Sequence, residues 1–234
     1  MPDDHDRPVY LVVGAGPGMG LWCASRFAAH GWRTVLVGHE IGAVESVADQ
    51  LAEMHPDAPR ALTCVADAGD PITLRASIEA LALSRIDVAH YNVSTWVPGA
   101  LDSDLAAVSA GLDAGAVSAL AMVQAVQPRM SAAGQGAVIF TGSGAADKPS
   151  AASLGLGMQK AALRNLAIGL QPVLAPEGIR VLHFTICGVL APDSPFSPPV
   201  ISERIAELVL DASGTGLRPL AATPQWDPAV PYRG

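Results

Sequence analysis

The chain has few charged residues, few basic residues in particular, and no long uninterrupted apolar run. Only 15% of its 234 residues are charged and 50% are hydrophobic, while 14 basic residues against 22 acidic ones give a formal charge of −8. Phosphate backbones are bound by clustered lysines and arginines, so this balance argues against a nucleic-acid partner. The low charged share indicates apolar surface buried between subunits, and we therefore predict a homodimer or homotetramer.

Cysteines are also scarce. Cys23, Cys64 and Cys187 are odd in number and far apart, which favours reduced thiols in a cytoplasmic protein over a disulfide framework. Residues 1–7 are acidic and polar, the opposite of a signal peptide, and the longest nearly apolar run, Ala114–Val126, is too short to span a bilayer. We therefore predict neither a membrane nor a metal ion as a partner.

A glycine-rich segment near the start of the chain carries the first functional signal. Five apolar residues, Val9–Val13, predict a buried strand, and Leu21–His30 predicts a helix. Between them Gly14, Gly18 and Gly20 have the spacing G-x3-G-x-G. Main-chain N–H groups at a helix N-terminus can approach a pyrophosphate only where no Cβ intervenes, so this segment predicts a phosphate-binding turn.

Strand and helix patterns alternate along the rest of the chain. Strands are predicted at Thr34–Val37, Ala61–Val65, Val88–Asn92, Ala137–Thr141 and Ile179–Ile186. Helices are predicted at Val44–His55, from Pro71 with Asp70 as its cap, and at Asp102–Met130, Ser153–Leu174 and Ile201–Leu210. This order predicts an α/β fold with a single doubly wound, Rossmann-type parallel sheet and helices on both faces. We expect one domain over residues 1–234, with a proline-rich C-terminal lid or tail over about 190–234.

Five motifs occur in the order found in the short-chain dehydrogenase/reductase family, over nearly all of the first 190 residues. They are the glycine segment, Asp67 after the third strand, Asn92 in Tyr91–Ser94, the strand and serine of Gly136–Ser143 with the lysine helix at Lys160–Leu163, and the turn Ile186–Val189. The chain therefore resembles that family. The resemblance implies an oxidoreductase that uses a nicotinamide dinucleotide.

The resemblance also implies which residues bind the cofactor. They are Gly14, Pro17, Gly18, Met19, Gly20, His39, Asp67, Ala68, Asn92, Val93, Ser94, Lys160, Gly188 and Val189. Lys160 is expected to hold the nicotinamide ribose. Gly38 lacks the carboxylate that would repel a 2′-phosphate, and His39 stands where members that prefer NADP often have arginine, so NADP(H) is favoured over NAD(H).

The sequence departs from the family pattern at the proton donor. The family has a tyrosine four residues before the lysine, where this chain has Leu156, and an asparagine where it has Gly115. Of the catalytic set only Ser143 and Lys160 remain, which predicts an atypical member that lacks the active-site tyrosine. The substrate pocket is predicted from Trp96, Ser143, Leu156, Cys187 and Phe196.

Losing a positioned general acid typically costs about 10² to 10⁴ in rate, which weakens carbonyl reduction without abolishing hydride transfer. An iminium, a quinone or a conjugated enone needs no proton in the same step, and Ser143 could hydrogen-bond a developing oxyanion. Alternatively the donor has moved, with Ser153, Tyr91, His183 and Tyr232 as candidates. Among them Tyr232 is favoured, because Tyr91 should be packed on the face of its strand opposite Asn92.

These observations predict an NADP(H)-dependent oxidoreductase that reduces an apolar small molecule at a C=N, quinone or conjugated C=C/C=O group. Two alternatives remain open. One is a non-redox enzyme, such as a dehydratase, isomerase or cyclase, that keeps the same scaffold. The other is a non-catalytic protein that binds NADP as a sensor or serves as a partner of another protein.

Overall fold

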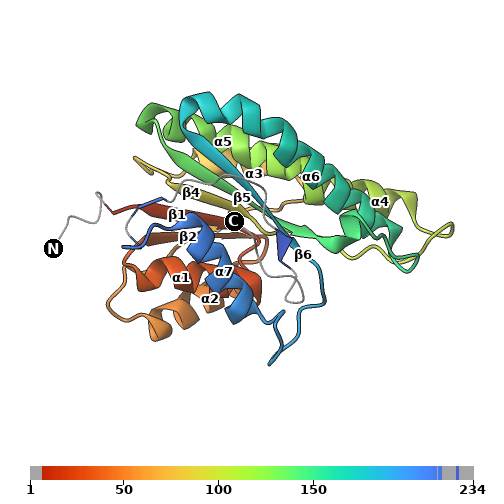
Figure 1. Cartoon of the computed structure of the whole chain (residues 1–234), viewed down its shortest axis with the longest axis horizontal. Helices are drawn as coiled ribbons and strands as arrows, with labels where there is room; N and C mark the ends of the chain where they lie inside the picture. Colours follow the sequence, from red (N-terminus) through yellow and green to blue (C-terminus); the bar gives the residue numbers. More distant parts are fainter. Residues whose placement is uncertain (1–6, 215, 218–224, 227–234) are drawn as a thin grey trace.

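A computed structural model describes residues 7–214, 216–217 and 225–226, and these form one seven-stranded sheet in the order β3-β2-β1-β4-β5-β6-β7 (Figure 1). Every pairing between neighbouring strands is parallel. The strands are β1 Val9–Val13, β2 Arg33–Gly38, β3 Leu62–Val65, β4 Val88–Tyr91, β5 Gly136–Ser143, β6 Ile179–Ile186 and β7 Gln225–Trp226. The α-helices are α1 Met19–Ala29, α2 Ile41–Met54, α3 Pro71–Glu79, α4 Leu105–Leu112, α5 Ser118–Ala133, α6 Leu154–Leu174 and α7 Pro198–Val209. The predicted doubly wound fold is confirmed.

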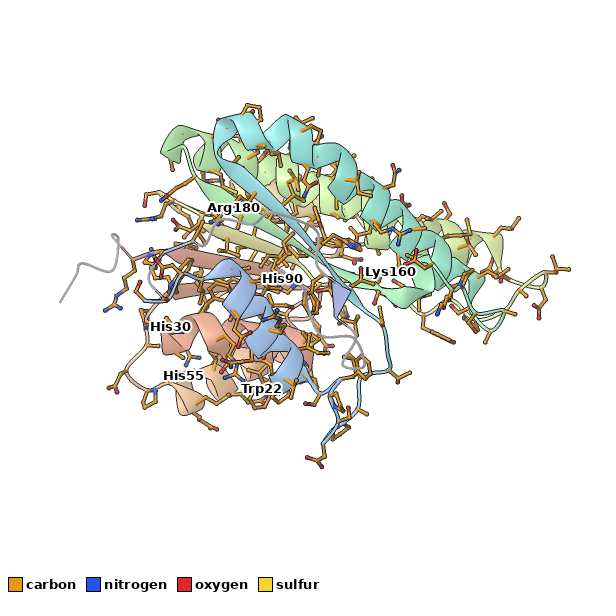
Figure 2. All side chains as sticks on the ribbon, viewed as in Figure 1. Trp22, His30, His55, His90, Lys160 and Arg180 are labelled. Atoms are coloured by element: carbon orange, nitrogen blue, oxygen red, sulfur yellow. The ribbon has the colours of Figure 1, made fainter. Side chains whose placement is uncertain are left out.

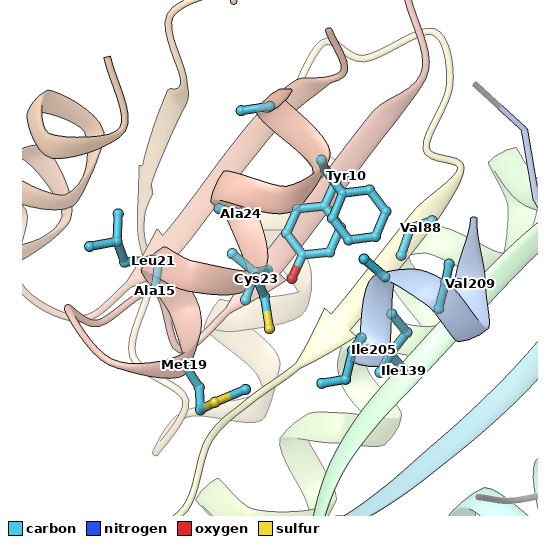
Figure 3. Close-up of a cluster of buried hydrophobic side chains, with 14 of the residues drawn as sticks. Tyr10, Ala15, Met19, Leu21, Cys23, Ala24, Val88, Ile139, Ile205 and Val209 are labelled. Carbon is cyan, nitrogen blue, oxygen red and sulfur yellow. The ribbon is translucent and has the colours of Figure 1, made fainter. Parts of the chain in front are cut away.

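Helices cover both faces of the sheet because the strands are apolar on both sides. Tyr10 and Val12 of β1 belong to a buried cluster with α1, α2 and α7, part of which is drawn in Figure 3. Leu11 and Val13 belong to a second buried cluster with α3, α5 and α6. Successive side chains of a strand point to opposite faces, so one apolar run supplies both layers. Because all the strands are parallel, their carboxyl ends meet at one edge of the sheet.

Two elements differ from the sequence prediction near that edge. Strand β5 continues two residues beyond the predicted end, so Ser143 is its last residue and pairs with Ile186 of β6. The predicted helix over Asp102–Met130 is divided into α4 and α5 by a turn of π-helix at Asp113–Val117. Such turns occur mostly as single insertions in α-helices and often lie at functional sites.

The helical segment Leu105–Ala133 is long and apolar enough, by length and composition alone, to cross a membrane. The length of this helix agrees with the prediction over Asp102–Met130, whereas the apolar run Ala114–Val126 alone was judged too short to span a bilayer. In the fold α5 packs against β4 and β5, and its Met122 and Val126 are buried there. It therefore lies where the core helix of an α/β sheet is expected.

The C-terminal tail adds a short edge strand. Residues Gln225 and Trp226 pair with Thr185 and Ile186 of β6. An edge position agrees with the prediction that this proline-rich segment forms no central strand. Tyr232, the favoured candidate for a relocated proton donor, lies outside the described residues.

Candidate functional site

A cavity of about 750 Å³ lies at the carboxyl ends of β1, β2 and β4. Nine residues predicted to bind a cofactor or substrate line it, namely Gly14, Pro17, His39, Asp67, Ala68, Asn92, Val93, Ser94 and Trp96. They come from four separate segments of the chain, which the sheet brings together. Parallel α/β sheets bind ligands at this edge, so the cavity is the first candidate for a binding site.

The glycine turn is fixed by the close approach of main-chain segments. Gly14 has φ of +90°, and a methyl group there would lie 2.8 Å from the main-chain oxygen of Asn92. A methyl group on Gly20 would lie 2.7 Å from the oxygen of Gly14. Gly16 and Gly18, by contrast, face open space. The turn is thus closed on the side of the sheet and bare toward solvent, where the N-terminus of α1 leaves main-chain N–H groups without intrahelical acceptors.

Lys160 lies on α6 and is 4% exposed (Figure 2). Its Nζ donates hydrogen bonds to the main-chain oxygens of Thr141, at 2.8 Å, and Val93, at 3.2 Å. An ammonium group has three N–H donors, so one remains without an acceptor among the described residues. Burial lowers the pKa of Lys160 to about 8. The side chain is therefore a positioned cation beside the loop that lines the cavity.

Two buried histidines lie in the sheet near Lys160. In β4, His90 Nε2 lies 2.8 Å from Thr141 Oγ1, and its Nδ1 lies 2.7 Å from the hydroxyl of Tyr10. Burial, and then the charge of Lys160, lower the pKa of His90 to about 3. The same two causes, in the same order, lower the pKa of His183 in β6 to about 4. Both imidazoles are consequently neutral at pH 7.

A second cavity, of about 530 Å³, lies at the ends of β5 and β6. Ser143, Cys187 and Gly188, which the sequence singled out, line it. Ser143 is half-buried, and its Oγ accepts a hydrogen bond from the N–H of Ala145 at 3.2 Å, which leaves the hydroxyl proton available to donate. Cys187 is exposed, and its Sγ lies 3.9 Å from the main-chain oxygen of Thr185. This cavity therefore offers a hydroxyl donor next to the main chain of Gly188.

The comparisons with known proteins identify the family. Residues 8–194 match the family model described as short chain dehydrogenase. The chain belongs to the short-chain dehydrogenase/reductase family. The match covers both cavities and ends before α7.

Similar members have several activities. The chain is 30% identical to the BbsC subunit of (2S)-[(R)-hydroxy(phenyl)methyl]succinyl-CoA dehydrogenase from Thauera aromatica, over 59% of this chain but only 55% of the length of BbsC. It is 28% identical to sulfoacetaldehyde reductase 2 of Chromohalobacter salexigens, over 74% of this chain and 69% of that protein. A metagenomic short-chain oxidoreductase solved with NADP is 21% identical, with a TM-score of 0.81 over 95% of this chain and 99% of that one. At that identity the last comparison shows the fold alone.

In this chain Leu156 occupies the position on α6 one helical turn before Lys160, where the family pattern has a tyrosine, and its side chain is half-buried. Two of the described candidates for a relocated donor are hydrogen-bonded to main-chain oxygens, and the third is buried. The Ser153 hydroxyl donates to the Val97 oxygen at 2.6 Å, and the Tyr91 hydroxyl donates to the Ala114 oxygen. His183 is buried in the sheet at 0% exposure. Tyr91 is packed in the core, as predicted.

Some predicted site residues do not line either cavity. Met19 and Gly20 are buried at the start of α1, and Gly18 is the residue that precedes this helix. Val189 is 84% exposed. Leu156 lies on α6, and Phe196 packs against the cluster around α1 and α7, with its ring over Gly188. The predicted substrate residue Trp96 lines the larger cavity instead of the Ser143 cavity.

Three residues at these cavities were not predicted from the sequence. Thr95 lines the larger cavity and is hydrogen-bonded by Gln159, which is fully buried on α6. Lys148 lines the second cavity, where the neighbouring Asp147 is paired with Arg164. For Gln159 the only signal was an amide directly before the family lysine, and Lys148 gave no signal beyond its charge.

Proposed function

We propose that this protein is an NADP(H)-dependent oxidoreductase with a non-standard catalytic site. Its substrate is an apolar small molecule with a C=N bond, a quinone or a conjugated C=C/C=O group. The observation that carries the proposal is the combination of a bare glycine turn with the buried, partly unpaired ammonium of Lys160 at the same edge of the sheet. Leu156 beside that ammonium selects the substrate class.

The residues at the larger cavity fit a dinucleotide. A pyrophosphate would meet main-chain N–H groups at the start of α1, where Gly16 and Gly18 leave open space. Asp67 would contact the adenine end and His39 the 2′-phosphate. Lys160 lines neither cavity, but its Nζ is bonded to Val93 of the cavity wall, from where its third N–H would reach a ribose hydroxyl. A reduced nicotinamide, when bound, supplies a hydride. The chain's own contribution is to orient that group and keep its surroundings apolar.

At the second cavity the Ser143 hydroxyl can donate a hydrogen bond to an oxygen on which negative charge develops. Leu156 can neither donate nor accept a proton, so no phenol at this position delivers one. Substrates whose reduced product is stable without simultaneous protonation are therefore favoured over plain ketones. The apolar residues Leu156 and Val93 near Lys160 fit such a substrate.

The test measures binding and turnover together. Calorimetric titration with NADPH, NADP⁺, NADH and NAD⁺ is followed by NADPH oxidation assays on panels of iminium ions, quinones, conjugated enones and plain ketones. We expect NADPH binding and turnover of the first three panels. Efficient reduction of plain ketones would contradict the substrate class, and failure to bind any of the four nucleotides would contradict the redox assignment.

A second candidate function is a catalytically inactive partner of a redox enzyme. It is favoured by Leu156 and by the similarity to a protein named as a dehydrogenase subunit. Binding of NADPH without turnover on any panel would support it, whereas turnover without NADPH oxidation would support a non-redox enzyme.

We also propose that the protein forms a homodimer or homotetramer in the cytoplasm. Exposed apolar residues on α4, the π-helical turn and α6 support the oligomer, among them Leu105 at 81%, Val117 at 46% and Met158 at 48% exposure. The three reduced cysteines support the compartment. Light scattering of the purified protein tests the first of these, since a monomer at micromolar concentration would contradict it.

A further inference from the structure

Gln159 connects α6 to the loop that follows β4. Its side chain is completely buried, and its carboxamide bonds both polar main-chain atoms of Thr95. The Oε1 atom accepts from the Thr95 N–H at 3.0 Å, and Nε2 donates to the Thr95 oxygen at 2.9 Å. The side chain thereby satisfies the main-chain N–H and C=O groups of a residue in an irregular loop, as a neighbouring strand would do in a sheet.

Two further side chains of the same region hold the same loop. Lys160 donates to the oxygen of Val93, and Ser153, the residue preceding α6, donates to the oxygen of Val97 at 2.6 Å. The three held residues are thus every second residue of the loop 93–97. This alternation leaves Ser94 and Trp96 between the anchored positions, and all five residues line the larger cavity.

Glycines on the facing helix make room for this arrangement. A methyl group on Gly111 of α4 would lie 2.6 Å from Nε2 of Gln159. A methyl group on Gly115, in the π-helical turn, would lie 2.7 Å from its Cγ. Real Cβ atoms do not come this close to other atoms, so any larger residue at either position would displace the carboxamide from Thr95.

We propose that Gln159 is a positioning residue that sets the wall of the larger cavity at Thr95 and Trp96 and thereby the affinity for the dinucleotide. The proposal rests on the proposed function, because it assumes that this cavity holds a nicotinamide cofactor. Gln159 does not itself line the cavity and acts through Thr95, which does. The space that the Gln159 side chain needs also explains why α4 and the following turn have glycine at two positions that face α6.

The first experiment compares Gln159→Met with wild type, since methionine fills a similar volume but makes neither hydrogen bond. We expect the NADPH dissociation constant to rise about tenfold, as for the loss of one or two hydrogen bonds. Hydrogen exchange at the Thr95 amide should become faster, while the far-UV circular dichroism is retained. Gln171→Met is the matched control on the same helix, because Gln171 bonds the Val181 oxygen of β6 and no residue of the cavity loop 93–97, and it should change neither quantity.

The second experiment is a double-mutant cycle between Gly111→Ala and Gln159→Ala, read by the melting temperature. With Gln159 present, Gly111→Ala should lower the melting temperature, because its methyl group meets the carboxamide. In the Gln159→Ala background, the same change should lower it less or raise it, because the added methyl group no longer meets a carboxamide, although it keeps the 3.2 Å contact with Val97 Cγ2, and alanine favours helix. This cycle also carries the test if Gln159→Met does not fold.

The proposal that Gln159 holds the loop at Thr95 would be overturned by either of two results. One is a Thr95 amide that exchanges in Gln159→Met at the same rate as in wild type. The other is a Gly111→Ala change that shifts the melting temperature equally in both backgrounds. Faster exchange with unchanged NADPH affinity would overturn its role in binding. If the wild-type protein binds no dinucleotide, the proposed function fails, while the exchange and melting data still decide whether Gln159 holds the loop.

Discussion

The ammonium of Lys160 is held by the main-chain oxygen of Thr141, 2.8 Å away, and not by a carboxylate. Among the described residues no aspartate or glutamate forms an ion pair with it. A buried cation that is compensated only by carbonyl dipoles is costly to keep charged. This explains why burial lowers the pKa of Lys160, from 10.5 to about 8.

The pH dependence of unfolding should report this buried charge. Between pH 8 and 10.5 the unfolded chain holds a proton on Lys160 that the folded protein has lost, so the free energy of unfolding rises with pH in that window. Lys160→Met lacks this group. In urea titrations from pH 7 to 10, wild type should gain stability relative to the variant by up to about 1.4 kcal/mol per pH unit. A difference between the two that stays constant would contradict the lowered pKa.

The buried histidines determine how the free energy of unfolding depends on pH at acidic pH. The pKa values of His90 and His183 are lowered from 6.5 to about 3 and about 4, so between pH 6.5 and 4 the unfolded chain binds more protons than the folded one. Stability is therefore lost as the pH falls through this range. His183→Leu removes one of the two groups and a buried ring nitrogen that has no partner among the described residues. The slope of the unfolding free energy against pH should decrease by the amount that corresponds to about one bound proton. An unchanged slope would show that His183 does not contribute.

The fold could be predicted from the sequence wherever local residue chemistry decides the structure. Strand β6 has the predicted bounds, because a mostly apolar stretch that begins right after Gly178 and is buried on both faces is a clear strand signal. Asp70 caps α3 as predicted, through hydrogen bonds from the N–H groups of Ile72 and Thr73, with Pro71 at the first helical position. The glycine turn followed in the same way from residues near one another in the chain.

The parts that were missed depend on contacts between distant residues. The π-helical turn at Asp113–Val117 faces Gln159, a residue of another helix, so the glycine spacing alone gives no reason to divide the predicted helix there. Gln159 and Thr95 are 64 residues apart, and no periodicity connects them. The position of Leu156 was visible from the sequence, but only the fold shows that the hydroxyls of Ser153 and Tyr91 are bonded to main-chain oxygens.

Cofactor preference should respond to His39, which is exposed at the end of β2 and lines the larger cavity. Replacing it with arginine puts a permanently charged, bidentate donor where a 2′-phosphate is expected. The ratio of NADPH to NADH affinity, measured by fluorescence titration, should increase by about tenfold, a typical effect of one charge-assisted hydrogen bond. His39→Asp should reverse the preference through repulsion. Equal effects of both variants on NADPH and NADH would place the 2′-phosphate elsewhere.

Leu156→Tyr should restore the reduction of plain ketones. Position 156 is one helical turn before Lys160 on the same face of α6, and its half-buried side chain leaves space toward solvent. The neighbouring ammonium would lower the pKa of the introduced phenol, which could then deliver a proton to the carbonyl oxygen that Ser143 binds. We expect kcat/KM for ketones to rise by about 10² or more, within the range for a positioned general acid. NADPH oxidation with a panel of ketones measures it.

The control for this gain is Leu156→Phe, which adds the same ring without the hydroxyl. If the ring merely improves substrate packing, phenylalanine and tyrosine will accelerate ketone reduction equally, and the proton-transfer argument is wrong. If the hydroxyl is responsible, only tyrosine will do so, and Ser143→Ala in the same background will remove most of the gain. Turnover of iminium ions and quinones should change little in either variant, because these substrates need no proton in the reducing step. A large loss there would mean that Leu156 itself shapes the substrate site.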